Sequence, residues 1–153
     1  MGALQHTTPV YLAVHVNHAE EITEEVVAAL ERLSASGVVL LSQTVLLKGV
    51  NDDAEVLAQL FRALVRLKVR PYYLHHPDLA PGTSHFRVSL EDGQALMQQV
   101  RQRVSGLCLP TYVLDIPGGF GKVPVGSDHI GRRTASGFRE IQDIRGVTHC
   151  YPE

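Results

Sequence analysis

Four apolar, β-rich segments alternate along this chain with segments whose apolar residues recur at helical spacing. Strands that are apolar nearly throughout are typical of a parallel sheet, and amphipathic helices between them supply its cover. The sequence therefore predicts an α/β fold of parallel strands with covering helices. An open doubly wound sheet and a segment of a barrel both satisfy this order. The expected strands are residues 9–16, 38–47, 69–75 and 111–116.

The expected helices begin at capping residues. Asn51, Asp52 and Asp53 form an N-cap cluster ahead of an apolar stripe with i, i+3, i+4 and i+7 spacing. Ser89 and Asp92 resemble a capping box at the start of a later helix. A further helix is expected over residues 20–36. The stripe consists of Leu57, Leu60, Phe61, Leu64 and Leu67.

The last part of the chain differs in composition from the rest. Gly, Ser, Arg and Asp dominate from residue 124 to residue 146. We therefore expect a barrel segment over residues 1–125, including a loop that carries Lys122, and an irregular tail over residues 126–153 with room for one short hairpin.

Composition narrows the classes of function. The chain has 153 residues, enough for one domain with a buried core. Its net charge is −2 and 20% of its residues are charged, so nothing indicates binding to nucleic acid or an anionic membrane surface. No apolar run approaches the roughly 20 residues of a membrane span, and no signal peptide is recognisable. Two cysteines make no disulfide framework, so a cytoplasmic location is expected.

A glycine-rich segment, DIPGGFGK, follows the fourth expected strand and ends in Lys122. Glycines permit a tight turn, and a lysine held on such a loop can form a Schiff base with a carbonyl compound. An ordinary turn with a solvated lysine fits the same spacing. A nucleotide-binding P-loop does not fit, because Ile116 stands at its first glycine position and Val123 replaces its Ser or Thr.

Polar residues collect at the ends of all four expected strands. His15 ends the first, Gln43 lies in the second, His75 and then Asp78 follow the third, and Asp115 ends the fourth. Ligands of parallel α/β sheets bind at the carboxyl ends of the strands. We therefore expect these side chains to lie close together in a binding site.

Two kinds of site fit these residues. The histidines with Asp78 and Asp115 could bind a metal, as in a barrel hydrolase. Lys122 could instead hold a carbonyl cofactor while the two aspartates bind a cationic substrate. Against a metal, no His-x-His pair follows a strand, and His15 and His18 diverge at a strand exit. The residues alone leave both alternatives open.

Six colinear segments run from about Pro9 to the end of the chain: PVYLAVHVNHAEEIT, LLSQTVLLKGVND, VRPYYLHHPDL, SHFR, SGLCLPTYVLDIPGGFGKVPV and GVTHCYPE. Together they resemble the lysine 2,3-aminomutase family of radical S-adenosylmethionine enzymes. The resemblance implies the C-terminal half of a partial (β/α)6 radical SAM barrel, which is TIM-like. It also implies a small amino-acid substrate, L-lysine or a lysyl-like group, interconverted with β-lysine by radical 2,3-amino migration.

The resemblance assigns roles residue by residue. Lys122 matches the lysine that binds pyridoxal phosphate as a Schiff base, which makes it the expected catalytic residue. Asp78 and Asp115 match the two aspartates that hold the distal ammonium of substrate lysine. His15 and Gln43 match positions near S-adenosylmethionine. His75 stands where lysine enzymes often have tyrosine.

The departures from the family are as informative. The Cys-x-x-x-Cys-x-x-Cys motif that binds the family's 4Fe-4S cluster is absent, and Cys108 and Cys150 are 42 residues apart (150 − 108). One cysteine of a structural zinc site found in some aminomutases is replaced by Asp53. No metal site is therefore expected in this chain.

These departures predict a chain that lacks the family's N-terminal half. Its first strand would have an unpaired edge, so we expect the isolated chain to be inactive and either poorly stable or oligomeric. The alternative function is a non-catalytic remnant or binding module of the same fold. A metal-dependent barrel hydrolase is a more distant alternative.

Overall fold

The computed structural model describes residues 8–126, 128–135 and 137–152. Within them, the larger sheet has the strand order β1-β2-β3-β4-β5. Strands β1 to β4 are parallel and β5 is antiparallel to β4. The predicted α/β class with a parallel sheet is confirmed. The strands are β1 (Tyr11–His15), β2 (Val39–Val45), β3 (Val69–His75), β4 (Thr111–Ile116) and β5 (Gly121–Pro124).

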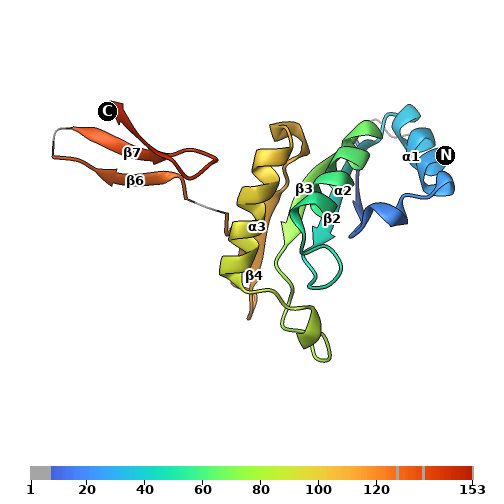
Figure 1. Cartoon of the computed structure of the whole chain (residues 1–153). Coiled ribbons are helices and arrows are strands. Elements are labelled where there is room, and N and C mark those ends of the chain that lie inside the picture. Colours follow the sequence, from blue (N-terminus) through green and yellow to red (C-terminus); the bar gives the residue numbers. More distant parts are fainter. Residues whose placement is uncertain (1–7, 127, 136, 153) are drawn as a thin grey trace.

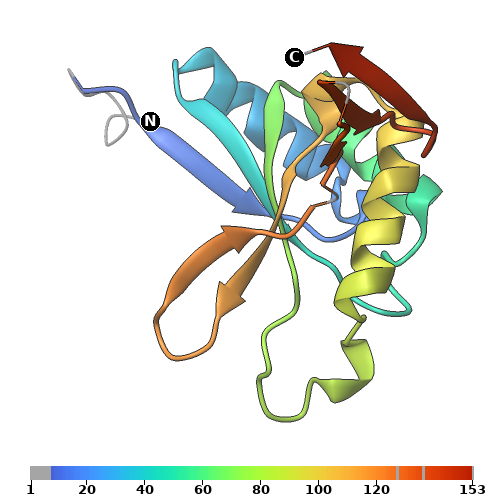
Figure 2. The same cartoon turned by 90° about the vertical axis from the view of Figure 1, so that its left-hand side faces the viewer.

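Three helices cover one face of this sheet, as Figures 1 and 2 show: α1 (Glu24–Ala35), α2 (Ala54–Arg66) and α3 (Leu90–Arg103). Each begins at a side chain that accepts a backbone N–H: Thr23, Asp53 and Ser89 respectively. The first helix starts later than the sequence predicts, because His18 caps a separate 3-10 turn, η2 (Ala19–Glu21). Two further 3-10 turns are η3 (Ser84–Phe86) and η4 (Gly106–Cys108).

The core lies between α2 and the sheet. The predicted stripe of α2 supplies Leu57, Leu60, Phe61 and Leu64, all fully buried, while its last member, Leu67, is half-buried beside them. Burial of this stripe against the sheet and α3 removes apolar surface from water and stabilises the layer.

Among the described residues, no helix lies over the opposite face of the sheet (Figures 1 and 2). Alternate residues of β2, namely Leu40, Ser42 and Thr44, are buried on the helix side, whereas Val39 is 41% exposed and Gln43 is half-buried. Because successive side chains of a strand point to opposite faces, Gln43 lies on the uncovered face. This face carries the candidate site.

Strand β1 lies at one edge of the larger sheet. Among the described residues it pairs only with β2, and four of its five residues are exposed. The opposite edge is β5, which turns back along β4. An exposed edge strand presents unpaired backbone groups to solvent or to another chain. The unpaired first edge expected from the sequence is therefore present in this part of the chain.

The predicted irregular tail is wrong for the residues that the structure describes. A second, antiparallel sheet is formed by β6 (Ile130–Arg133), β7 (Phe138–Gln142) and β8 (Thr148–Pro152). It lies beyond α3, on the side away from α1 (Figure 1). These strands are short and mostly exposed, so their sequence has no apolar run to mark them. The domain boundary after residue 125 stays a prediction.

Two polar contacts connect this second sheet to α3. The side-chain amides of Gln98 and Gln102 both donate to the carbonyl of Ile144, at 2.6 and 2.8 Å. No helix among the described residues has the length and apolar character needed to cross a membrane.

Candidate functional site

Strand register brings the predicted polar residues together. His15 is the partner of Gln43 in the β1–β2 pair, and Val45 is the partner of His75 in the β2–β3 pair. Since Gln43 and Val45 point to the same face of β2, all four side chains share the uncovered face of the sheet.

A cavity of about 370 Å³ opens at this end of the sheet. Its lining includes four of the predicted site residues, His15, Gln43, Asp78 and Asp115. They come from β1, β2, the loop after β3, and β4. The structure therefore gathers these four residues around one space, as expected from the ends of parallel strands.

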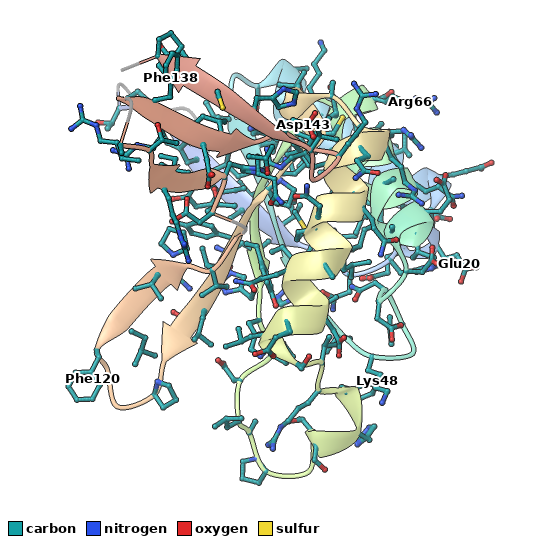
Figure 3. The ribbon with its side chains drawn as sticks, turned by 60° about the vertical axis from the view of Figure 1, so that its left-hand side comes forward. Glu20, Lys48, Arg66, Phe120, Phe138 and Asp143 are labelled. Atoms are coloured by element: carbon teal, nitrogen blue, oxygen red, sulfur yellow. The ribbon has the colours of Figure 1, made fainter. Side chains whose placement is uncertain are left out.

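The fifth predicted residue, Lys122, lies on a strand and not on a loop. The glycine-rich turn ends before Gly121, and β5 then runs antiparallel to β4 with Asp115 directly opposite Lys122. Gly118 and Gly119 have φ of 92° and 80°, a left-handed conformation that favours glycine. The turn reverses the chain at Phe120, which is 79% exposed at the hairpin tip (Figure 3).

Lys122 contacts the cavity through Asp115. Its Nζ lies 2.5 Å from Oδ2 of Asp115, a charge-assisted hydrogen bond. The side chains of Lys122 and Asp115 are 31% and 42% exposed. The hydrogen bond from Lys122 is the main cause that lowers the pKa of Asp115, and His75 adds to it. Asp115 is therefore a carboxylate at neutral pH.

His75 completes this group. Its Nδ1 lies 3.3 Å from Oδ2 of Asp115 and 3.3 Å from Nζ of Lys122. Burial lowers the pKa of His75 and the Lys122 charge lowers it further, while Asp115 opposes both. The imidazole is therefore neutral at pH 7. Its Nε2 is buried without a hydrogen-bond partner among the described residues.

Two tyrosines that sequence reasoning did not single out border the group. The Tyr73 ring centroid lies 5.5 Å from Nζ of Lys122, within cation–π range. The hydroxyls of Tyr72 and Tyr73 are hydrogen-bonded over 2.9 Å, and this bond is the main cause that raises the pKa of Tyr73. In the sequence, the two tyrosines are marked only by being adjacent to each other shortly before His75.

The side chain of Asn51 hydrogen-bonds to the backbone at the ends of both β1 and β2, beside the cavity. Its side-chain Nδ2 donates to the carbonyls of Asn17 and Val45, both at 2.9 Å, and its Oδ1 accepts from the Leu47 N–H at 2.7 Å. It is fully buried. The sequence placed Asn51 in a capping cluster, but Asp53 is the cap, and only long-range contacts reveal this role.

Curated relatives of this chain were found by sequence similarity. No family model matches the chain. It is 45% identical over 153 residues to L-lysine 2,3-aminomutase of Clostridium subterminale, covering 100% of this chain and 36% of that enzyme. It is 37% identical over 145 residues to L-lysine 2,3-aminomutase of Bacillus subtilis, covering 95% of this chain and 31% of that enzyme.

A glutamate 2,3-aminomutase of Clostridioides difficile is 39% identical over 137 residues, which cover 84% of this chain and 32% of that enzyme. Among solved structures, a radical SAM methyltransferase from Sphaerobacter thermophilus matches 71% of this chain and 34% of its own, with a TM-score of 0.51 and 21% identity. That likeness supports the predicted radical SAM fold.

The chain spans about a third of the length of the curated relatives it matches. The family resemblance seen in the sequence is confirmed by the identity that extends over most of the chain. Because 37–45% identity covers 95–100% of its residues, this chain belongs to the lysine 2,3-aminomutase family, to whose C-terminal portion it corresponds.

Proposed function

We propose that this chain carries the pyridoxal phosphate lysine and the substrate-ammonium site of an enzyme that interconverts L-lysine, or a lysyl-like substrate, and β-lysine. The observation that carries the proposal is the contact between Lys122 and Asp115 at the border of the cavity that Asp78 also lines. An amine and two carboxylates are thereby gathered around one space large enough for a small ligand.

The residues present fit pyridoxal phosphate. Lys122 has a partly exposed amine whose hydrogen-bond neighbours are Asp115 and His75, so it can leave them and attach to a carbonyl group. Among the described residues Nε2 of His75 is buried without a hydrogen-bond partner, which is the kind of orphaned polar atom that a ligand bound beside it would satisfy. When bound, pyridoxal phosphate would supply a conjugated ring that can delocalise an unpaired electron beside the amino group, which is the chemistry that radical amino migration requires.

Asp78 and Asp115 suit a cationic side chain. Once Lys122 turns toward a cofactor, Asp115 loses its ion-pair partner, and a substrate ammonium can replace it. Asp78 is exposed on the loop after β3 and lines the same cavity. Two carboxylates favour lysine over glutamate, because a glutamate side chain would meet like charge. The relatives include enzymes named for each of these substrates.

His15 and Gln43 are proposed to lie near S-adenosylmethionine. They are neighbours in register at the ends of β1 and β2 and line the cavity. The residues present do not fit a 4Fe-4S cluster, because Cys108 is buried in the core and Cys150 is exposed on β8. No group of three or more potential metal ligands occurs within the part of the chain that the structure describes.

We therefore propose that radical generation depends on groups outside this sequence and that the 153-residue chain alone is inactive. Its own residues bind, orient and shield: Lys122 holds the cofactor, the aspartates orient the substrate, and the cavity walls limit access of water. The exposed edge of β1 is consistent with a partner or a further segment beside it.

A cofactor titration tests the proposal. Pyridoxal phosphate is added to the wild-type chain and to Lys122→Met, which keeps the length of the side chain but removes its amine. The wild type is expected to develop the absorbance of a lysine-bound pyridoxal group, and Lys122→Met is not. Lys68→Met is the matched control, since Lys68 is exposed between α2 and β3. Equal signals from all three proteins would instead favour a non-catalytic remnant or binding module.

A further inference from the structure

The side chain of Tyr112 connects β4 to the loop that carries Asp78. Its hydroxyl lies 2.7 Å from Nδ1 of His76, and the two rings meet edge to face with centroids 6.1 Å apart. Tyr112 is only 3% exposed. Neither residue belongs to the site predicted from the sequence, although His76 lines the cavity.

Helix α3 is shaped to admit this hydroxyl. A Cβ added to Gly93 would lie 2.0 Å from the Tyr112 hydroxyl oxygen and 2.7 Å from the ring carbon that bears it. Glycine is unfavourable inside a helix because it gains no side-chain packing and loses backbone entropy. At Gly93 the missing side chain makes room for Tyr112, so the glycine is explained by the tyrosine.

The direction of the hydrogen bond follows from burial. The Tyr112 hydroxyl has no second hydrogen-bond partner among the described residues. Burial raises the pKa of Tyr112 to about 12, so the hydroxyl keeps its proton. If Nδ1 of His76 carried a proton, the buried O–H of Tyr112 would have no acceptor, which is costly. The hydroxyl therefore donates to Nδ1.

The tautomer of His76 follows in turn. Burial lowers the pKa of His76, so its ring is neutral at pH 7, and an accepting Nδ1 leaves the single proton on Nε2. The backbone N–H of His76 also donates to the carbonyl of Val113 over 2.7 Å. His76 is thus fixed to β4 at its backbone and its ring, two residues before Asp78.

We propose that Tyr112 is a positioning residue, which fixes His76 as the Nε2–H tautomer at the cavity wall and thereby orients the following loop with Asp78. Pro77, between them, is buried and leaves the backbone little freedom to adjust. The inference rests on the proposed function in so far as Asp78 binds the substrate ammonium. Its structural part does not depend on any cofactor.

Nitrogen-detected NMR of the full chain tests the structural part. Wild-type His76 is expected to show the Nε2–H tautomer. Tyr112→Phe, which removes only the hydroxyl, should give a mixture of tautomers and a shifted Asp78 amide resonance. Gly93→Ala should produce the same two changes by displacing the hydroxyl. Tyr151→Phe, an exposed tyrosine on β8, is the matched control and should leave both signals unchanged.

Two results would overturn the proposal. One is an Nδ1–H tautomer of His76 in the wild type. The other is an Asp78 amide resonance that is unchanged in Tyr112→Phe. The measurement needs no pyridoxal phosphate, so it is independent of whether Lys122 binds the cofactor. L-lysine should protect cofactor-bound Lys122 from borohydride better than L-norleucine, which lacks the distal ammonium. A positioning role further predicts that Tyr112→Phe reduces this preference severalfold, while attachment of the cofactor to Lys122 persists. Loss of both together would point to disruption of the whole site and contradict the specific role.

Discussion

Lys122 and Asp115 face each other across the β4–β5 hairpin, with Nζ 2.5 Å from Oδ2. The same lysine is the proposed cofactor anchor and the same carboxylate a proposed substrate anchor. In this ion pair the Lys122 amine occupies the proposed place of the substrate ammonium on Asp115, and Asp115 engages the amine that would attach to the cofactor. Cofactor attachment to Lys122 would therefore release Asp115 for a cationic substrate.

The ion pair predicts how Asp115 titrates. Lys122 is the main cause of the lowered pKa of Asp115, so Lys122→Met should move that pKa back up toward its ordinary value of 3.8. Because the folded-state pKa is lowered, the contribution of the pair to stability is present above 3.8 and is lost as the pH falls through the folded value. Carbon NMR of the side-chain carboxyl measures the shift. An unchanged titration in Lys122→Met would show that the pair does not form.

Asp78 is expected to decide substrate preference. Amino acids that compete for the cofactor should protect Lys122 from reduction with borohydride, and L-lysine should protect better than L-norleucine, which lacks the distal ammonium. Loss of one charge-assisted hydrogen bond in Asp78→Asn should reduce this preference about tenfold, equivalent to about 1.4 kcal/mol. Glu91→Gln, an exposed acid at the start of α3, is the control. A preference that survives Asp78→Asn removes Asp78 from the ammonium site.

Asn51→Ala should destabilise the carboxyl ends of β1 and β2. The change removes three hydrogen bonds of a fully buried side chain and leaves backbone groups such as the Leu47 N–H unpaired. We expect a loss of about 2–4 kcal/mol in the free energy of unfolding, measured with urea. Asp52→Ala, which removes one exposed hydrogen bond to Gly49, should cost less than about 1 kcal/mol. Equal losses would contradict the role assigned to Asn51.

Asp143 should hold the turn between β7 and β8. Its Oδ1 accepts the N–H groups of Arg145 and Val147, and its Oδ2 lies 3.0 Å from Nε2 of His149. The His149 contact is the largest cause that lowers the pKa of Asp143 to about 2. Asp143→Asn should speed amide hydrogen exchange in β7 and β8 but leave Leu74 in β3 unchanged. Faster exchange in both sheets would mean that they unfold as one unit.

The sequence was sufficient to predict the parallel layer. The stripe headed by Leu57 and the four apolar strands reflect local periodicity, which a single chain displays directly. It also predicted which residues would meet at the cavity, because parallel strands bring their carboxyl ends to one edge. This rule alone was enough to predict that Asp115 and Gln43 would lie at the same site.

What the sequence could not supply depends on pairing between distant residues. Lys122 lies on a strand only because Gly121–Pro124 finds hydrogen-bond partners in β4, and the short exposed strands β6 to β8 likewise exist through each other. Tyr112 looks like an ordinary core residue until Gly93 and His76 are seen beside it. Such contacts carry no local period, so pattern alone does not reveal them.

The most direct test of the proposed function is the position of the pyridoxyl group after reduction. The wild-type chain is mixed with pyridoxal phosphate, reduced with borohydride and digested, and the label on each lysine is quantified by mass spectrometry. The sequence contains Lys48, Lys68 and Lys122; the first two lie on loops, and Lys122 is the one that contacts Asp115 of the cavity lining. The proposed function predicts that the label concentrates on Lys122. Equal labelling of the three lysines would contradict it.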